Sequence, residues 1–260
     1  MIKQIYKSII SENSRLKNRL LINKLTSIFY RGNVLECNFC GKTFKKFKAK
    51  GTWTKRQNAE CPYCGSVERG RLLLFYLQNE TGIFSEQCSL LHVAPELGLR
   101  PIFKSCKTLK YYNVDINPNY ADIQMDLMDI QFPDDSFDYI ICSHVLGHVP
   151  NEGKAIAEMC RVLKPTGMAL IMTIIDWKNP QTYESDKVKT DSERLKHYSE
   201  HDLLRLHGAD FAERLAASGF EVEVVDYISA LGKEKNVRFS LGNGDRETIF
   251  KCTKMKKGAN

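Results

Sequence analysis

Four cysteines are the residues whose type and spacing most clearly predict chemistry. They occur in the motifs CNFCG and CPYCG, with twenty residues between the second and third, and are Cys37, Cys40, Cys61 and Cys64. Four thiolates at this spacing can enclose a zinc ion tetrahedrally, and the glycine after each motif permits a tight turn around sulfur. Because four protein ligands leave no open coordination position, we predict a structural zinc ribbon; a redox-active cysteine pair is the alternative.

The stretch LLHVAPELGLRP, residues 90–101, predicts a strand that turns into a helix without a glycine in the turn. A small residue at Ala94 lets the backbone approach a ligand, and Pro95 fixes φ, so these two can replace a glycine loop. Glu96 then lies near a helix N-terminus, where a carboxylate is favourable and can meet an ammonium group of a cofactor.

Further polar residues follow the next predicted strands. Asp115 ends YYNVDIN about twenty residues later, the position at which an acid accepts hydrogen bonds from ribose hydroxyls. Asp126 follows a third strand, and the buried strand FDYIIC stops at Ser143 and His144. Because parallel strands end at one edge of a sheet, these residues predict a ligand site at the carboxyl edge.

Short apolar runs alternate with helical patterns from residue 88 onward, which is typical of βαβ units wound on a parallel sheet. The long connection before the last run predicts an antiparallel final pair. We therefore expect an α/β, Rossmann-like seven-stranded sheet in residues 67–260, preceded by a zinc ribbon at 34–66 and an amphipathic basic helix in 1–33. The expected strands lie at 89–94, 110–116, 122–127, 137–146, 167–175, 221–227 and 246–254.

The positive charge is concentrated at the N-terminus. Residues 1–60 hold 14 Lys and Arg against 3 Asp and Glu, a net charge of +11, so the total of +7 leaves −4 for the remainder. Between the cysteine motifs, Phe44, Phe47 and Trp53 alternate with six lysines and one arginine. Such a segment can bind nucleic acid, while a solvated ribbon whose aromatic rings pack beneath the zinc explains it equally.

Residues 14–30 show helical spacing of apolar residues opposite Lys and Arg. The apolar face of this helix could pack on the chain's own core or on a second subunit; the second case would give a homodimer through this helix. Alternatively, the apolar face could lie on a membrane surface. No run approaches the roughly 18 apolar residues of a spanning helix, and no signal peptide is apparent. We expect a cytoplasmic protein whose five other cysteines are small buried side chains.

The run from DIQMDL through FPDDSFDYIICSHVL, with EGKAIAEMCRVLKPTG and MALIMTII after it, resembles class I S-adenosylmethionine-dependent methyltransferases. The closer resemblance is to bacterial methyltransferases with an N-terminal zinc ribbon, a loop of the LHxAPE type and a later segment of the type TYED…FGQxDHVRxYG. It covers roughly residues 35 to 227, and it implies S-adenosyl-L-methionine as cofactor beside structural Zn²⁺.

The resemblance also implies positions for the cofactor. Ala94, Pro95 and Glu96 would line its methionine end, and Ser143 and His144 would face the reacting methyl group. The ribose would lie on Asp115, with Ile116 also in the cofactor site, and Asp126 with Leu127 would border the adenine.

Several positions depart from the resembled pattern. HVLEHVP is here HVLGHVP, so Gly147 lacks a carboxylate, and FGQxDHVRxYG is here YSEHDLLRLHG. Glycine, glutamine, histidine and tyrosine are thereby replaced by Ser199, Glu200, Leu203 and His207. Three of the lost groups could have held or deprotonated a substrate, so either the substrate differs or the activity is weaker.

His144 is the first candidate for a general base, because it ends the fourth strand beside the expected methyl group, and His148 lies one helical turn farther. Shaping the pocket or capping the next helix explains His144 equally. Arg205, in a polar cluster with His201 and Asp202, could hold a phosphate or carboxylate of the acceptor or form a surface ion pair.

The sequence thus predicts a methyltransferase that O-methylates a small-molecule or glycan hydroxyl, with residues 176–208 covering the pocket. An RNA methyltransferase that uses the basic ribbon to bind nucleic acid is one alternative. A non-catalytic cofactor-binding or adaptor protein is the other.

Overall fold

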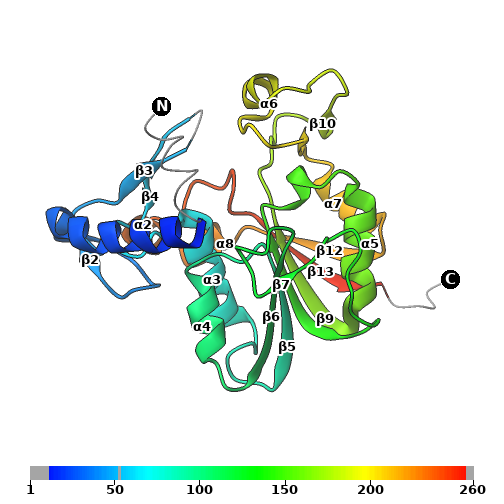
Figure 1. Ribbon diagram of the computed structural model, residues 1–260, viewed down its shortest axis with the longest axis horizontal. Helices are drawn as coiled ribbons and strands as arrows, with labels where there is room; N and C mark the ends of the chain where they lie inside the picture. The colour runs from blue at the N-terminus through cyan, green and yellow to red at the C-terminus, as the bar shows by residue number, and fades with distance from the viewer. Residues whose placement is uncertain (1–11, 52–53, 256–260) are drawn as a thin grey trace.

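The computed structural model describes residues 12–51 and 54–255. In chain order it contains a leading helix, a small ribbon of two two-stranded sheets and an α/β sheet domain (Figure 1). Trp53, counted above among the aromatic residues of the ribbon, lies outside the described residues.

The central sheet has seven strands in the order β12-β13-β9-β8-β5-β6-β7. The first five strands in sequence pair in parallel, whereas β13 is antiparallel to both of its neighbours. The predicted Rossmann-like seven-stranded sheet with an antiparallel final pair is therefore confirmed. The strands are β5 Cys88–Val93, β6 Leu109–Asp115, β7 Ile123–Gln124, β8 Phe137–Ser143, β9 Leu163–Met172, β12 Phe220–Val225 and β13 Ile249–Lys254.

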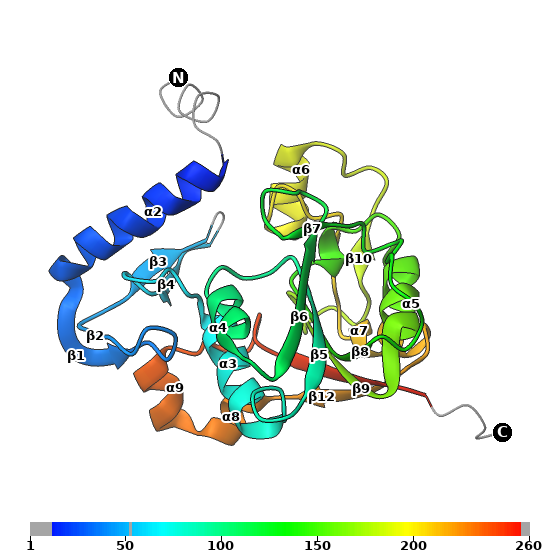
Figure 2. The ribbon, with the colours of Figure 1, turned by 60° about the horizontal axis from the view of Figure 1, so that its bottom comes forward.

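Helices cover both faces of this sheet (Figure 2). One face packs on α5 (Glu152–Val162) and α7 (Phe211–Ala216). The other packs on α3 (Glu68–Glu80), α4 (Leu99–Ser105), α8 (Tyr227–Leu231) and α9 (Lys233–Phe239). Of these, α3 was not predicted, and the long connection before β13 contains α8 and α9.

The ribbon is formed by β1 (Arg31–Glu36), β2 (Thr43–Phe44), β3 (Lys48–Lys50) and β4 (Arg56–Glu60). Its small core combines Leu35, Phe44 and Phe47 with cysteine side chains. The two phenylalanine rings meet edge to face, 5.8 Å apart. These two rings therefore pack beneath the cysteines and are not free to stack on nucleic-acid bases. This packing agrees with the explanation in which the aromatic rings of the basic segment support the ribbon.

The leading helix α2 (Glu12–Thr26) and the 3₁₀ turn Ser27–Tyr30 pack on the ribbon (Figure 2). The contact is polar: Arg19 binds Glu60, and Lys48 Nζ donates to Asn23 Oδ1 at 2.8 Å. Leu20 is half-buried, but five other apolar side chains of this segment are exposed, so burial in the chain's own core does not explain their helical spacing. They are Leu21, Ile22, Leu25, Ile28 and Phe29. A homodimer through this helix remains a prediction.

A long segment, called the lid below, runs from residue 173 to 210 between β9 and α7. It contains β10 (Tyr183–Glu184), α6 (Asp191–Tyr198) and β11 (Arg205–Leu206) and rises above the carboxyl edge of the sheet (Figure 1). Thr190 and Glu193 form a capping box that fixes the start of α6. None of the helices in the described part of the chain combines the length and apolar character needed to cross a membrane.

Candidate functional site

The four cysteines of the ribbon converge on one point. Sγ of Cys37 lies 3.6 Å from Sγ of Cys64, and Sγ of Cys40 lies 3.9 Å from Sγ of Cys61. All four sulfur atoms lie within 4.8 Å of one another. Zinc–sulfur bonds of about 2.3 Å in a tetrahedron place sulfur atoms about 3.8 Å apart. The donor set and its spacing therefore fit a four-coordinate zinc ion.

The two cysteine motifs form the same turn. Gly41 N donates to Cys37 O at 2.8 Å, and Gly65 N donates to Cys61 O at 3.0 Å. Both glycines are left-handed, with φ of 64° and 76°. A side chain would be strained in that conformation, which explains why each motif ends in glycine.

Arg71 of α3 joins the ribbon to the sheet domain. Its buried guanidinium donates to the carbonyl oxygens of Ala59 and Ser66 in the ribbon. It also donates to the carbonyl oxygens of Phe239 and Ser240, at the end of α9. One side chain thus satisfies acceptors from both parts of the protein and fixes the position of the ribbon.

The predicted cofactor residues follow neighbouring strands at one level of the sheet. β5 pairs with β6 and with β8, and Val93 lies level with its partner on each side. The next residue of each strand therefore lies at the carboxyl edge: Ala94, Asp115 and Ser143.

The turn after β5 is tight and closely packed. Ala94 is left-handed, with φ of 45°, and its N–H donates to Val114 O at 2.8 Å. Farther along the turn, Gly98 contacts the ring of Phe39 from the ribbon, and a Cβ at Gly98 would lie 2.7 Å from that ring. The loop is thus held between the sheet and the ribbon.

Glu96 is the acid of this loop. Nε2 of His92 lies 2.7 Å from Glu96 Oε2 and donates, because a carboxylate accepts. Burial alone would raise the pKa of Glu96, but the hydrogen bond from His92 and the charge of Arg69 hold it below its usual value. Oε1 of Glu96 and Oγ of Ser143 are both buried without a partner at hydrogen-bond distance, although Ser143 lies near enough to Glu96 to help lower its pKa. Unpartnered buried polar atoms mark a place for a polar ligand.

A cavity of about 270 Å³, called the loop cavity below, opens beside Glu96. It lies between the loop, the ribbon, α2 and the start of α3. Its lining includes the predicted residues Ala94, Pro95 and Glu96, together with Phe39 and Arg69. The structure thus joins three predicted cofactor residues to one cavity.

The acids after β6 and β7 each use one oxygen in a local turn. Oδ1 of Asp115 and Oδ1 of Asp126 each accept a hydrogen bond from the backbone N–H two residues later, at 2.8 Å. Beside Asp115, Ile116 is 69% exposed although it is apolar, whereas Leu127 is buried. An exposed aliphatic side chain beside an acid suits a nucleoside, whose base is flat and whose ribose carries hydroxyls.

A second cavity of about 400 Å³, called the edge cavity below, lies at the same edge. It is bounded by the ends of β8 and β9, the lid and the hairpin β3–β4. The predicted catalytic residues His144 and His148 both line it, together with Gly147. Arg69 lines both cavities, so the two are adjacent.

His144 is neutral at ordinary pH. Burial lowers its pKa well below the usual 6.5, and the charge of Arg69 lowers it further. Nε2 of His144 lies 3.0 Å from the carbonyl oxygen of Arg246, so Nε2 carries the hydrogen and donates. The lone pair of the ring is therefore on Nδ1, and the lowered pKa makes this nitrogen a weaker base than that of an ordinary histidine.

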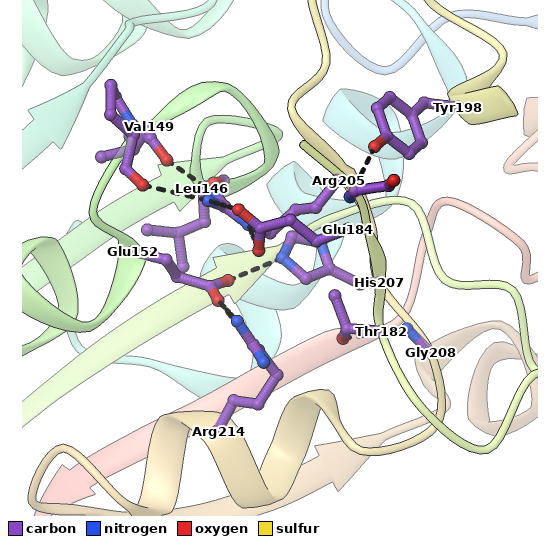
Figure 3. A network of polar contacts seen from close by, with 12 residues as sticks. Leu146, Val149, Glu152, Thr182, Glu184, Tyr198, Arg205, His207, Gly208 and Arg214 are labelled. Carbon is purple, nitrogen blue, oxygen red and sulfur yellow. Dashed lines mark hydrogen bonds and ion pairs between the residues drawn. The ribbon is translucent and has the colours of Figure 1, made fainter. Parts of the chain in front are cut away.

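Arg205 has a different position from the one expected of an acceptor ligand (Figure 3). Its side chain is 2% exposed, and its guanidinium donates to the carbonyl oxygens of Leu146, Val149 and Pro150. It also binds both carboxylate oxygens of Glu184. Arg205 lines neither the loop cavity nor the edge cavity. Its contacts fasten the lid to the turn after β8.

A second buried contact fastens the lid to α5. His207 Nε2 donates to Glu152 Oε1 at 2.6 Å, and Arg214 binds the other oxygen of Glu152 (Figure 3). Burial would raise the pKa of Glu152, but the bonds from His207 and Arg214 hold it below its usual value. His207, which stands where the resembled pattern has tyrosine, therefore forms a structural contact with Glu152.

Three arginines were missed by the sequence analysis. Arg56 of β4, Arg69 of α3 and Arg246 before β13 all line the edge cavity. The signal for Arg69 was the ERGR sequence at 68–71, which directly follows the ribbon. Arg56 was counted only as the one arginine of the basic ribbon segment, and Arg246 carried no signal, because only the folded chain brings the two together.

One part of the chain matches a known protein family. Residues 91–171 match the family described as "Methyltransferase domain". The ubiquinone/menaquinone biosynthesis C-methyltransferase UbiE of Pasteurella multocida is 34% identical over 114 residues, which are 42% of each protein. Demethylmenaquinone methyltransferase of Staphylococcus carnosus is 44% identical over 50 residues, 19% of this chain and 21% of that protein. The chain thus spans less than half the length of these curated relatives.

Among solved structures, the [4+2]-cyclase SpnF is similar over 94% of this chain and 97% of its own, with a TM-score of 0.52 and 15% identity. This likeness establishes the fold alone. Since that protein is described as a cyclase, the fold does not decide the reaction.

Proposed function

We propose that this protein transfers a methyl group from S-adenosyl-L-methionine to a hydroxyl of a small molecule or glycan. The observation that carries the proposal is the pair of unpartnered buried atoms, Glu96 Oε1 and Ser143 Oγ. Both lie at the carboxyl edge within residues 91–171, the segment that matches a methyltransferase domain. A cofactor with an ammonium group would complete the hydrogen bonding of both atoms.

The residues at this edge fit the cofactor. Glu96, held ionised by His92, would bind the ammonium group, and the strained turn at Ala94 lets the backbone approach the methionine end. Asp115 would accept hydrogen bonds from the ribose, with Ile116 against the base. Asp126 and Leu127 would border the adenine. When bound, S-adenosylmethionine supplies an electrophilic methyl group on a sulfonium ion.

The acceptor would occupy the edge cavity beside His144. In the proposed reaction the hydroxyl proton moves to His144 Nδ1, whose ring is held by the bond from Nε2 to Arg246 O. The proton would leave as the oxygen bonds to the methyl carbon and the methyl–sulfur bond breaks, which would release S-adenosylhomocysteine. The lid, fastened by Arg205 and Glu152, would exclude water from the site.

A third cavity of about 530 Å³ extends from the edge cavity and shares Arg56 and Arg246 with it. It is lined by Trp177, whose ring is 46% exposed. An exposed indole ring offers a flat apolar surface to the C–H face of a sugar. This surface supports a glycan or glycosylated acceptor.

The ribbon is proposed as a structural zinc site, since Cys37, Cys40, Cys61 and Cys64 leave no open position. Its role in the proposed reaction is to form one wall of both the loop cavity and the edge cavity. Phe39 lines the first and Arg56 lines the second.

A second candidate is C-methylation of a phenolic quinone precursor, favoured by the identity to UbiE. Removal of a phenolic proton by His144 would serve that reaction too, because the phenolate activates the ring carbon. The two reactions differ in whether the methyl group is bonded to oxygen or to carbon.

The experiment is incubation of purified protein with methyl-labelled S-adenosylmethionine and extracted glycans, phenolic metabolites or total RNA. Label should enter a glycan or small molecule through an oxygen, and His144→Asn should reduce kcat about 10²- to 10⁴-fold. Label on carbon would favour the second candidate, and label in RNA would contradict both. If no fraction is labelled although the cofactor binds, a non-catalytic role is favoured.

A further inference from the structure

Three arginines from separate elements meet in the wall of the edge cavity. Arg56 comes from the ribbon, Arg69 from α3 and Arg246 from the connection that precedes β13. All three act electrostatically on His144, the residue proposed to receive the acceptor's proton. The cations therefore surround the place where the reacting hydroxyl would lie.

Two of these arginines are already paired. Arg56 Nε donates to Glu68 Oε1 at 2.8 Å, and Arg246 Nη1 donates to Glu200 Oε1 at 2.9 Å. Each guanidinium has five N–H donors, so a single ion pair leaves further donors on both side chains.

Arg69 differs from the other two. It makes no hydrogen bond or ion pair with any residue in the described part of the chain, and its Nε is buried without a partner. Burial lowers its pKa; the charge of Glu96 opposes this change, and the charge of Arg246 adds to it. A guanidinium stays protonated under such conditions. A half-buried cation without a partner in the described residues, beside two further arginines, is a site for an anion.

We infer that the edge cavity binds an anionic group of the methyl acceptor, a phosphate or a carboxylate, between Arg69, Arg56 and Arg246. This inference rests on the proposed function and specifies its substrate class. The anionic group would orient the acceptor so that its hydroxyl lies beside His144. Glu200 and Asp202 also line the cavity. The first is neutralised by Arg246, and the second is exposed to solvent.

The position of the arginines favours the acceptor over the carboxylate of the cofactor. Only Arg69 lines the loop cavity as well, whereas Arg56 and Arg246 line the edge cavity and the cavity that continues toward Trp177. An anion that contacts all three arginines must therefore lie on the acceptor side of Arg69.

The test measures binding of inorganic phosphate by calorimetry to the zinc-loaded full-length protein saturated with S-adenosylhomocysteine. We expect phosphate to bind, and Arg69→Gln and Arg246→Gln each to weaken it at least about tenfold, the loss of one charge-assisted contact. Arg161→Gln is the matched control, because Arg161 pairs with Glu158 and Asp134 away from both cavities. An unchanged Tm verifies that each variant is folded, because Arg69 also lines the loop cavity and its replacement can alter cofactor affinity directly.

Each other outcome overturns the inference. If phosphate binds only to the protein free of S-adenosylhomocysteine and is displaced by it, the arginines bind the cofactor. Absence of phosphate binding in both forms, or binding that Arg246→Gln leaves unchanged, removes the anion site. Since the measurement needs no turnover, failure of methyl transfer with phosphate binding intact would contradict the proposed function and not the site.

Discussion

Leu203 occupies the space that a side chain at position 147 would need. A Cβ on Gly147 would lie 2.5 Å from Leu203 Cδ2, so Leu203, which is 5% exposed, would have to shift toward the edge cavity that it lines. Leu204 N also donates to Gly147 O at 2.8 Å. The two departures from the resembled pattern, glutamate to Gly147 and histidine to Leu203, therefore form one local repacking in which an apolar side chain covers a glycine.

This contact predicts coupling between the two positions. Gly147→Ala should lower the free energy of unfolding by about 1 to 3 kcal/mol because the site is overpacked. In a Leu203→Ala background the same change should cost at least about 0.5 kcal/mol less. Denaturant unfolding of the four proteins gives both values, and additive effects would contradict the contact.

The ribbon predicts one tightly held zinc ion per chain. Elemental analysis of protein purified without added metal should find zinc in a ratio near one, and chelation should lower Tm. Cys37→Ser should remove the metal, whereas Cys160→Ser, at a cysteine outside the ribbon, should retain it. Metal-free protein with an unchanged Tm would rule out a structural zinc.

Asp115 is expected to bind the ribose of the cofactor. Asp115→Asn keeps an oxygen for the turn with Asn117 N but removes the charge, so cofactor affinity should fall at least about tenfold, or roughly 1.5 to 3 kcal/mol. Asp134→Asn, at the opposite edge of the sheet, is the control. Calorimetry that finds wild-type affinity in Asp115→Asn would exclude this residue from the site.

The lowered pKa of His144 predicts a pH effect on stability. The unfolded chain takes up a proton near pH 6.5 that the folded protein binds only at lower pH. The unfolded state therefore binds more protons below pH 6.5, and stability should fall there by up to about 1.4 kcal/mol per pH unit. His144→Asn should show a shallower decline between pH 6.5 and 5; identical slopes in both proteins would refute the buried neutral histidine.

Ser199 ends α6 in a left-handed conformation, with φ of 69°, where the resembled pattern has glycine. Ser199→Gly should therefore raise the free energy of unfolding by about 0.5 to 1 kcal/mol. Ser192→Gly, within the same helix, should lower it by a similar amount. A destabilised Ser199→Gly would show that the serine side chain compensates for the strain.

Residues tied to strand ends were predictable from sequence. Asp115 and Ser143 lie at one edge because parallel strands of matched length must end together, and the apolar runs reveal those strands. The cysteine motifs were equally readable, since four sulfur ligands require a fixed spacing.

Residues that depend on contacts between distant segments were not predictable. Arg69 and Arg246 line the same cavity although they are 177 positions apart in the sequence. No periodic pattern in the sequence predicts a contact between such distant segments. Arg205 was placed in a polar cluster by its sequence neighbours, but carbonyl oxygens of the turn after β8 bury it. The apolar spacing correctly predicted a helix at α2. The exposure of the apolar side chains of α2 was not predictable, because it depends on polar contacts with the ribbon that the sequence pattern does not contain.

The bonds of Arg71 also order events during synthesis of the chain. The ribbon leaves the ribosome long before Phe239 and Ser240, which supply two of the four carbonyl oxygens that bind this guanidinium. Until those residues emerge, half of the acceptors of Arg71 are missing and the ribbon cannot take its final place. The ribbon is thus synthesised long before its position is fixed, and a nascent chain stalled before residue 239 would carry a ribbon that is not yet docked.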